Sequence, residues 1–203
     1  MTMRNSALSG ATMLDLSGND NDGTIHGCTD TEGIHGRAKY FDGSNDWIDV
    51  LHDLGNPSEM TISLWIYIEP GDQTRMQYLA DARNGGNWWF LQSYNPTGSG
   101  NINYNNQTTV DPSDWSDGEW THVCLTATGS ATHIYINGVE RSSPDTGFNP
   151  DIGYDLHFGT RYTNSSYFRG KMDEIAVFNR AISASEALRL YQKNNLYEID
   201  LEP

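Results

Sequence analysis

One carboxylate, that of Asp173, is predicted to lie among aliphatic side chains, where a charge is unfavourable. Residues 172–178 alternate as a strand does, which predicts that Asp173, Ile175 and Val177 point to one face and the even-numbered residues to the other. An ionised Asp among aliphatic side chains is costly unless it accepts hydrogen bonds or binds a cation. The pattern therefore predicts that Asp173 is either a hydrogen-bond acceptor or a cation ligand.

Aromatic side chains are the second group that could do chemistry. The chain has 6 Trp, 11 Tyr and 6 Phe, and sugars bind on aromatic ring faces beside hydrogen-bonding Asn, Asp, Gln and Arg. The candidates for such a groove lie in or beside polar, mostly Asn-rich segments: Trp88, Tyr94, Tyr104, Trp115, Arg161, Tyr162 and Tyr167. Each aromatic residue taken alone is more often core or loop cover than a ligand platform.

Catalytic motifs do not stand out. Glycoside hydrolysis needs two carboxylates that flank the scissile bond, but Asp173 and Glu174 are adjacent and so point to opposite faces of a strand. No G-x-S-x-G elbow occurs, and the 6 histidines show no H-x-x-x-H zinc spacing. Ser-His-Asp and Cys-His arrangements stay open. We predict that the chain is not an enzyme.

The charge and hydrophobicity of the chain limit the classes of partner that it can bind. Lys and Arg number 12 against 27 Asp and Glu, a formal net charge of -15, so no basic stripe for nucleic acid is visible. The acidity favours solubility, with carboxylates for Ca²⁺ as the sharper alternative. No apolar run is long enough to cross a membrane and no secretory signal is visible. These features leave the location open between an extracellular surface and a virion.

The chain reads as one domain, residues 1–203, rich in short strands and turns. Its 20 glycines and many Asn, Asp and Ser residues are typical of strands joined by tight turns. Residues 61–68 are the clearest strand, and Asn137-Gly138 marks a type I′ hairpin. Further strands are predicted at 38–50 (with a turn at 42–45), 78–82, 88–94, 101–106, 120–127, 132–136, 155–159 and 172–178. Cys28 and Cys124 are expected to be separate buried thiols rather than a disulfide.

The two ends of the chain differ from this pattern. Residues 1–13 are predicted to be irregular, with a missing or shortened first strand and hence an exposed sheet edge. A short helix should follow residue 183, because Ser183 and Glu186 form a capping box. The tail, residues 195–203, alternates again and predicts a strand that pairs in its own subunit or in a neighbour, giving a homo-oligomer through the edge or the tail.

Four segments carry a family resemblance: DLSGNDNDGT (15–24), GRAKYFDGSNDWIDV (36–50), EWTHVCLTATGSATHIYINGVE (119–140) and GKMDEIAVFNRAIS (170–183). Together they resemble laminin-G-like jelly rolls of the concanavalin A-like lectin/glucanase superfamily. The resemblance implies an all-β fold, a two-sheet antiparallel jelly-roll sandwich with one short C-terminal helix. Glycanases of this superfamily carry an E-x-D-x-x-E run, which is absent here.

The resemblance also implies a structural Ca²⁺ site. Related modules bind the ion through an Asp of the C-terminal strand, which Asp173 matches, with carbonyls near the first strands. The companions would be Asp42 and Gly43 of the FDG turn and Asp15 of the first loop. Asx turns and backbone hydrogen bonds without metal are the alternative for these carboxylates.

The function that follows is a non-enzymatic recognition or adhesion module for a glycan or cell-surface polysaccharide. The rival is a virion structural or phage decoration protein that uses the same fold to assemble with other virion or surface proteins. A third reading is an inactive or unrecognised glycanase. Neither nucleic-acid binding nor membrane insertion is expected.

Overall fold

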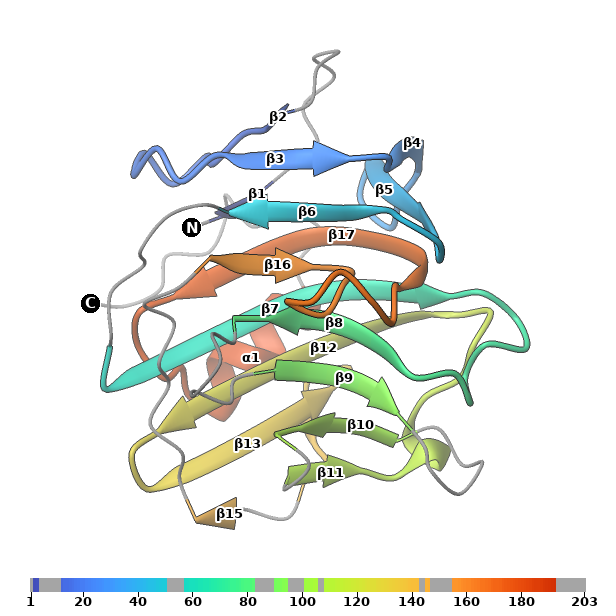
Figure 1. Cartoon of the computed structure of the whole chain (residues 1–203). Helices are drawn as coiled ribbons and strands as arrows, with labels where there is room; N and C mark the ends of the chain where they lie inside the picture. The colour runs from blue at the N-terminus through green and yellow to red at the C-terminus, as the bar shows by residue number, and fades with distance from the viewer. Residues whose placement is uncertain are drawn as a thin grey trace.

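The chain forms two antiparallel β-sheets that face each other (Figure 1). The structure, a computed structural model, describes residues 2–3, 12–50, 57–82, 90–94, 101–105, 108–142, 145–146 and 155–192. This confirms the predicted all-β, two-sheet jelly-roll sandwich with a short C-terminal helix. Among the described residues, no helix has the length and apolar character needed to cross a bilayer.

The first sheet has the last strand of the chain near its centre. Its order is β14 (Val139–Glu140), β13 (Ala131–Ile136), β12 (Trp120–Thr128), β7 (Glu59–Ile68), β17 (Arg169–Phe178), β5 (Arg37–Asp42) and β4 (Thr29–Glu32). Two short strands join it at the sides: β1 (Thr2–Met3) pairs with β17, and β15 (Asp145–Thr146) pairs with β13. Strand β17 therefore bonds to three segments that lie within the first 68 residues, β1, β5 and β7.

The second sheet contains the shorter strands. Its order is β11 (Thr108–Val110), β10 (Asn101–Tyr104), β9 (Phe90–Tyr94), β8 (Gln77–Asp81), β16 (Leu156–Phe158), β6 (Trp47–Val50), β3 (Gly23–His26) and β2 (Thr12–Met13). A 3₁₀ turn, η1 (Pro112–Asp114), follows β11.

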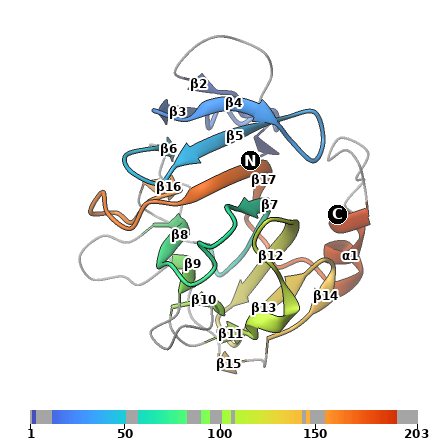
Figure 2. The ribbon, with the colours of Figure 1, turned by 90° about the vertical axis from the view of Figure 1, so that its right-hand side faces the viewer.

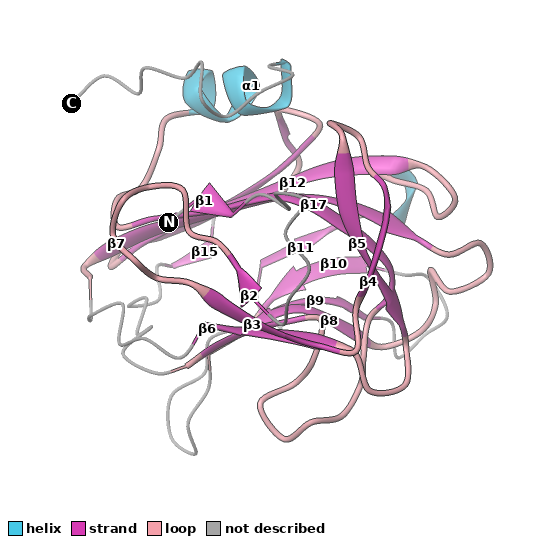
Figure 3. Cartoon of the chain, turned by 90° about the horizontal axis from the view of Figure 1, so that it is seen from above, coloured by secondary structure: helices cyan, strands magenta, loops and turns pink. Residues whose placement is uncertain are grey.

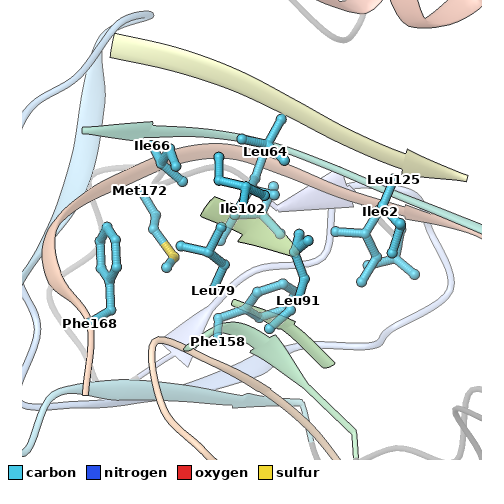
Figure 4. Packing of buried hydrophobic residues seen from close by; sticks show 14 of the residues in the cluster. Ile62, Leu64, Ile66, Leu79, Leu91, Ile102, Leu125, Phe158, Phe168 and Met172 are labelled. Atoms are coloured by element: carbon cyan, nitrogen blue, oxygen red, sulfur yellow. The ribbon is translucent and has the colours of Figure 1, made fainter. Parts of the chain in front are cut away.

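The hydrophobic core lies between the two sheets (Figure 4). Ile62, Leu64, Ile66 and Ile68 of β7 all point into it, and the strand predicted at residues 61–68 is confirmed. The two cysteines are free and buried on different sides of the first sheet, because Cys28 belongs to this core and Cys124 packs beneath the helix. Two separate thiols were the expectation, and it is confirmed.

Two predicted connections differ in the structure. Residues 38–50 form two strands as expected, but β5 and β6 belong to different sheets, so the turn at 42–45 carries the chain from one layer to the other. Residues 1–13, predicted to be irregular, contain the two-residue strands β1 and β2. The tail at 195–203 lies outside the described residues, so its role in oligomer formation stays a prediction.

The helix α1 (Ala184–Gln192) covers the outer face of the first sheet (Figures 2 and 3). Its buried residues Ala187 and Leu190 pack with Cys124 and Tyr135. The capping box is present: the Glu186 N–H donates to Ser183 Oγ at 3.3 Å, and the Ser183 N–H donates to Glu186 Oε2 at 2.6 Å.

Replacing Glu186 with alanine should destabilise the protein by about 1–2 kcal/mol, because it removes the cap and an ion pair. Arg180 binds the carboxylate through two nitrogens, at 2.6 and 3.2 Å. This arginine lowers the pKa of Glu186 to about 2, so the stabilisation is present at neutral pH and is lost as pH falls from about 4.5 towards 2. Urea unfolding at pH 7 and pH 3 measures it. Equal destabilisation at both pH values would contradict the prediction.

Candidate functional site

Asp173 is buried as predicted, but on the other face of its strand. The pairing of β17 with β7 shifts between Asp173 and Ala176, and Glu174 has a positive φ of 48°, so the strand contains a bulge. The bulge breaks the alternation. Met172 and Ile175 both face the core, while Asp173 lies opposite Trp65 on the outer face. The prediction that Asp173 shares a row with Ile175 and Val177 is therefore wrong.

Residues 33–36, between β4 and β5, shelter Asp173. The His35 N–H donates to Oδ2 at 3.1 Å and the Glu174 N–H donates to Oδ1 at 2.8 Å. A Cβ on residue 33 would overlap Oδ2, so the close approach requires Gly33. Burial raises the pKa of Asp173 to about 6, and these two donors only partly oppose that effect.

The other predicted calcium ligands lie elsewhere. Asp42 is opposite Arg169 in the β5–β17 pair, and its Oδ1 accepts the Ser44 N–H at 2.7 Å. The Gly43 carbonyl accepts from Arg75 Nη2 at 2.6 Å. Asp15 accepts hydrogen bonds within its own loop, from the N–H groups of residues 17 and 21. Within the ranges that the structure describes, no three acidic, His or Cys side chains could hold a metal together, so these residues do not fit a shared ion.

The predicted sugar-binding aromatics do not form one groove. Tyr104 and Trp115 are 1% and 5% exposed and belong to the hydrophobic core. As they lie, they cannot stack on a ligand that arrives from solvent, because their rings pack between the sheets. Trp88 lies outside the described residues. Tyr94 is the last residue of β9, but its side chain is also outside the description.

Arg161, Tyr162 and Tyr167 share the loop that joins β16 to β17, residues 159–168. The loop turns at Gly159, whose φ is +83° and where a Cβ would collide with Phe41. The Arg161 guanidinium lies over the Tyr162 ring, 5.5 Å from its centroid. All three side chains are half-buried. Of the seven predicted sugar-binding residues, these three are therefore brought together near solvent.

Tyr167 connects this loop to a cluster on the outer face of the second sheet. Its ring centroid is 6.2 Å from that of Trp47, and Trp47 stacks on His26 with centroids 4.2 Å apart and planes 12° apart. Asp49 and His157 lie beside them on β6 and β16. We refer to His26, Trp47, Asp49, His157 and Tyr167 as the His–Trp–Tyr cluster.

Strand register explains why the cluster forms. His26 of β3 is opposite Trp47 of β6, and Asp49 of β6 is opposite His157 of β16. The intervening Ile48 points into the core, so its neighbours on β6 point outwards. Figure 2 shows β3, β6 and β16 on the side of the molecule away from α1. The cluster is therefore on the face that the helix leaves uncovered.

Asp49 holds the cluster together electrostatically. His157 Nδ1 is 2.6 Å from Oδ1, and His26 Nε2 is 3.0 Å from Oδ2. Burial alone would raise the pKa of Asp49, but hydrogen bonds from His157 and the Trp47 side chain outweigh it, so the pKa lies below its ordinary value. An ionised carboxylate only accepts, so His157 Nδ1 carries a proton and its Nε2 faces away from Asp49.

Four of the five cluster residues were not among the predicted site residues. The sequence does contain one signal, since Trp47 and Asp49 are two apart on a strand and so share a face. It does not contain the register that places His26 and His157 on either side of them, because these residues come from three distant strands.

The outer face of the first sheet, on the other side of the molecule from the cluster, contains a serine–histidine pair. Ser63 Oγ is 2.9 Å from His122 Nε2, and burial lowers the pKa of His122 to about 3. Both residues are 1% exposed, beside Trp65 and Tyr191. No substrate could reach this serine without movement of α1. Trp65 is covered as well: it is 8% exposed and packs against His35 and Tyr191.

Comparison with known proteins gives a family match over most of the chain. Residues 42–187 match a laminin-G-type model described as the concanavalin A-like lectin/glucanases superfamily. The comparison with curated proteins found no significant match.

Solved structures share the fold at low sequence identity. Domain 4 of AbnA, a GH43 extracellular arabinanase from Geobacillus stearothermophilus in complex with arabinotriose, has a TM-score of 0.68 and 22% identity, covering 88% of this chain and 92% of that one. The ligand binding domain of botulinum neurotoxin serotype D in complex with N-acetylneuraminic acid has a TM-score of 0.70 and 15% identity, covering 95% and 50%. The binding domain of Paraclostridial Mosquitocidal Protein 1 has a TM-score of 0.68 and 17% identity, covering 94% and 51%. The chain thus spans about half of the two toxin chains.

Proposed function

Because the chain belongs to the concanavalin A-like lectin/glucanase superfamily, we propose that it is a non-enzymatic carbohydrate-recognition module that binds glycan at the His–Trp–Tyr cluster. The observation that carries the proposal is the arrangement of Trp47 and Tyr167 around a hydrogen-bonded Asp49 on the sheet face that α1 does not cover. Aromatic faces bind the apolar side of a sugar, and imidazole nitrogens bind its hydroxyls.

Known glycan complexes on this fold support the proposal in a general way. The AbnA domain was solved with arabinotriose and the neurotoxin domain with N-acetylneuraminic acid. These ligands differ in charge, since arabinotriose is neutral and N-acetylneuraminic acid carries a carboxylate. At such low identity the likeness concerns the fold, so the ligand class of this chain has to come from its own residues.

The cluster is better suited to binding than to hydrolysis. Glycoside hydrolysis uses an acid and a second carboxylate on opposite sides of the bond. The cluster contains one carboxylate, Asp49, whose two oxygens are both approached by histidine nitrogens. Asp81 of β8 is opposite His157 on the far side, but it is completely buried. An acid that solvent and substrate cannot reach does not protonate a leaving group.

Affinity electrophoresis of the full chain through gels containing arabinan, galactan, mixed-linkage β-glucan, pectin or a sialylated glycoprotein tests the proposal. We expect at least one polysaccharide to retard the native protein, with no release of reducing sugar on prolonged incubation. Unchanged mobility in every gel would rule out glycan recognition for this panel, and release of reducing sugar would contradict the non-enzymatic assignment.

A structural Ca²⁺ at Asp173 is a second, separate proposal. Its support is a carboxylate that is 3% exposed and is held by two backbone N–H groups, those of His35 and Glu174. A cation would offset the cost of burying the charge. Since Asp42, Gly43 and Asp15 lie elsewhere, the remaining ligands would be backbone carbonyls and water. Assembly into a virion stays a hypothesis, because nothing in the described residues favours it over recognition.

A further inference from the structure

We propose that the glycan is uncharged, and that Asp49 is the residue through which the site rejects anionic sugars. The inference rests on the proposed function and adds to it the chemical class of the ligand. It rests on the charge distribution around the His–Trp–Tyr cluster and on the pairing of basic side chains with carboxylates elsewhere among the described residues.

Basic side chains are scarce, and most of the described ones are already paired with carboxylates. The formal net charge is -15. The pairs are Arg37 and Lys39 with Asp30, Arg75 and Arg169 with Asp72, Arg141 with Asp114, and Arg180 with Glu186. A carboxylated or sulfated sugar is normally held by arginine or lysine that is free to pair with it. These side chains have little capacity left for an anionic ligand.

The described basic residues outside those pairs are Arg161, Lys171 and Arg189. Lys171 lies over the Tyr67 ring, 4.8 Å from its centroid, on the outer face of the first sheet. Arg189 is in the last turn of α1, also on that side. Arg161 alone is on the loop beside the cluster, and its guanidinium stacks on Tyr162. Among the described residues, recognition of an anion at the cluster would therefore depend on Arg161.

Asp49 places a negative charge within the cluster itself. Its side chain is 13% exposed, and it is shared between His157 and His26. If either imidazole carries a positive charge, that charge is already paired with this carboxylate. If an anionic sugar stacked its ring on Trp47, its carboxylate would lie close to Asp49. Little solvent is present there to screen the repulsion between the two negative charges. A neutral sugar carries no charge for Asp49 to repel.

The test compares polymers that share a backbone and differ in charge. The first pair is highly methyl-esterified pectin and its de-esterified product, and the second is hydroxyethyl cellulose and carboxymethyl cellulose. Arabinan, galactan and a sialylated glycoprotein complete the panel. Using the full chain at pH 7 and low salt, we expect binding to a neutral polymer and about tenfold weaker binding to an anionic one. Salt at about 0.5 M should narrow the difference, because it screens the repulsion.

Asp49→Asn identifies the residue responsible. Asparagine keeps the shape and one acceptor oxygen while removing the charge, so the ratio of neutral to anionic affinity should fall towards one even if both affinities decrease. Glu119→Gln is the matched control: it removes one negative charge at an exposed position before β12, and the ratio should stay at its wild-type value.

The outcomes separate the inference from the proposed function. Equal or tighter binding of anionic polymers, abolished by Arg161→Gln, would overturn the inference while leaving glycan recognition intact. Retained discrimination in Asp49→Asn would overturn the role of Asp49. Failure to bind any polymer of either charge would overturn the proposed function itself.

Discussion

Replacing Trp47 with alanine should weaken binding of a neutral polysaccharide by about tenfold or more, which corresponds to about 1.4 kcal/mol. The indole is the central ring of the His–Trp–Tyr cluster: it stacks on His26 at 4.2 Å and lies 6.2 Å from Tyr167. Its loss removes the apolar face for the sugar, and it also removes a hydrogen bond to Asp49. Isothermal titration with a polysaccharide retained in the electrophoresis panel measures the change.

Two further variants keep this prediction specific. Tyr67→Ala removes a half-buried aromatic ring from the outer face of the first sheet, and it should leave the affinity within about twofold of wild type. Trp47→Phe keeps a smaller ring face and should retain an intermediate affinity. Circular dichroism confirms that each variant is folded. Wild-type affinity in a folded Trp47→Ala protein would place the glycan elsewhere on the molecule.

Asp173 should make the protein less stable as pH rises from 4 to 7 in the presence of a chelator. Because burial raises its pKa to about 6 from 3.8, the folded state binds a proton between these values that the unfolded chain has released. The stabilisation is complete below about pH 4 and is lost as pH rises through 6, a change of about 3 kcal/mol. Glu186 acts in the opposite direction, but only below about pH 4.5.

Chemical denaturation of wild type and Asp173→Asn at half-unit pH steps isolates this contribution. The variant should lose the fall in unfolding free energy between pH 4 and 7, while Glu119→Gln, which alters an exposed carboxylate, should keep it. Identical pH profiles for wild type and Asp173→Asn would show that the carboxyl is not buried as described.

The same variants test the calcium proposal. Bound Ca²⁺ favours the ionised carboxylate, so millimolar CaCl₂ should raise the unfolding free energy at pH 7 in wild type. With free Ca²⁺ at about 100 times the Kd, the gain would be about 2.7 kcal/mol, and Asp173→Asn should abolish it. Equal stability in CaCl₂ and EDTA for wild type would end the proposal and leave the pH dependence unaffected.

Local patterns predicted much of the fold. The strand predicted at residues 61–68 corresponds to β7, the Asn137-Gly138 pair identified the β13–β14 hairpin, in which both residues have positive φ, and Ser183 with Glu186 identified the start of α1. Each signal comes from neighbouring residues that face the same physical constraint, so the sequence contains it directly.

Features set by distant contacts were harder to predict. The bulge at Glu174 inverts the face of Asp173, and it depends on how β17 meets β7 rather than on the strand alone. The turn at 42–45 resembles a hairpin locally, yet β5 and β6 pair with other strands in different sheets. The cluster depends on the register of three strands, and residues that are brought together by strand register leave no short-range pattern in the sequence.

The position of β17 has a consequence for synthesis of the protein. Residues 169–178 complete the first sheet by bonding to β7 on one side and to β5 and β1 on the other. Until the ribosome has released them, β7 and β5 are separate edges with unpaired backbone groups. The parts of the first sheet on either side of β17 therefore cannot join until residues 169–178 have left the ribosome.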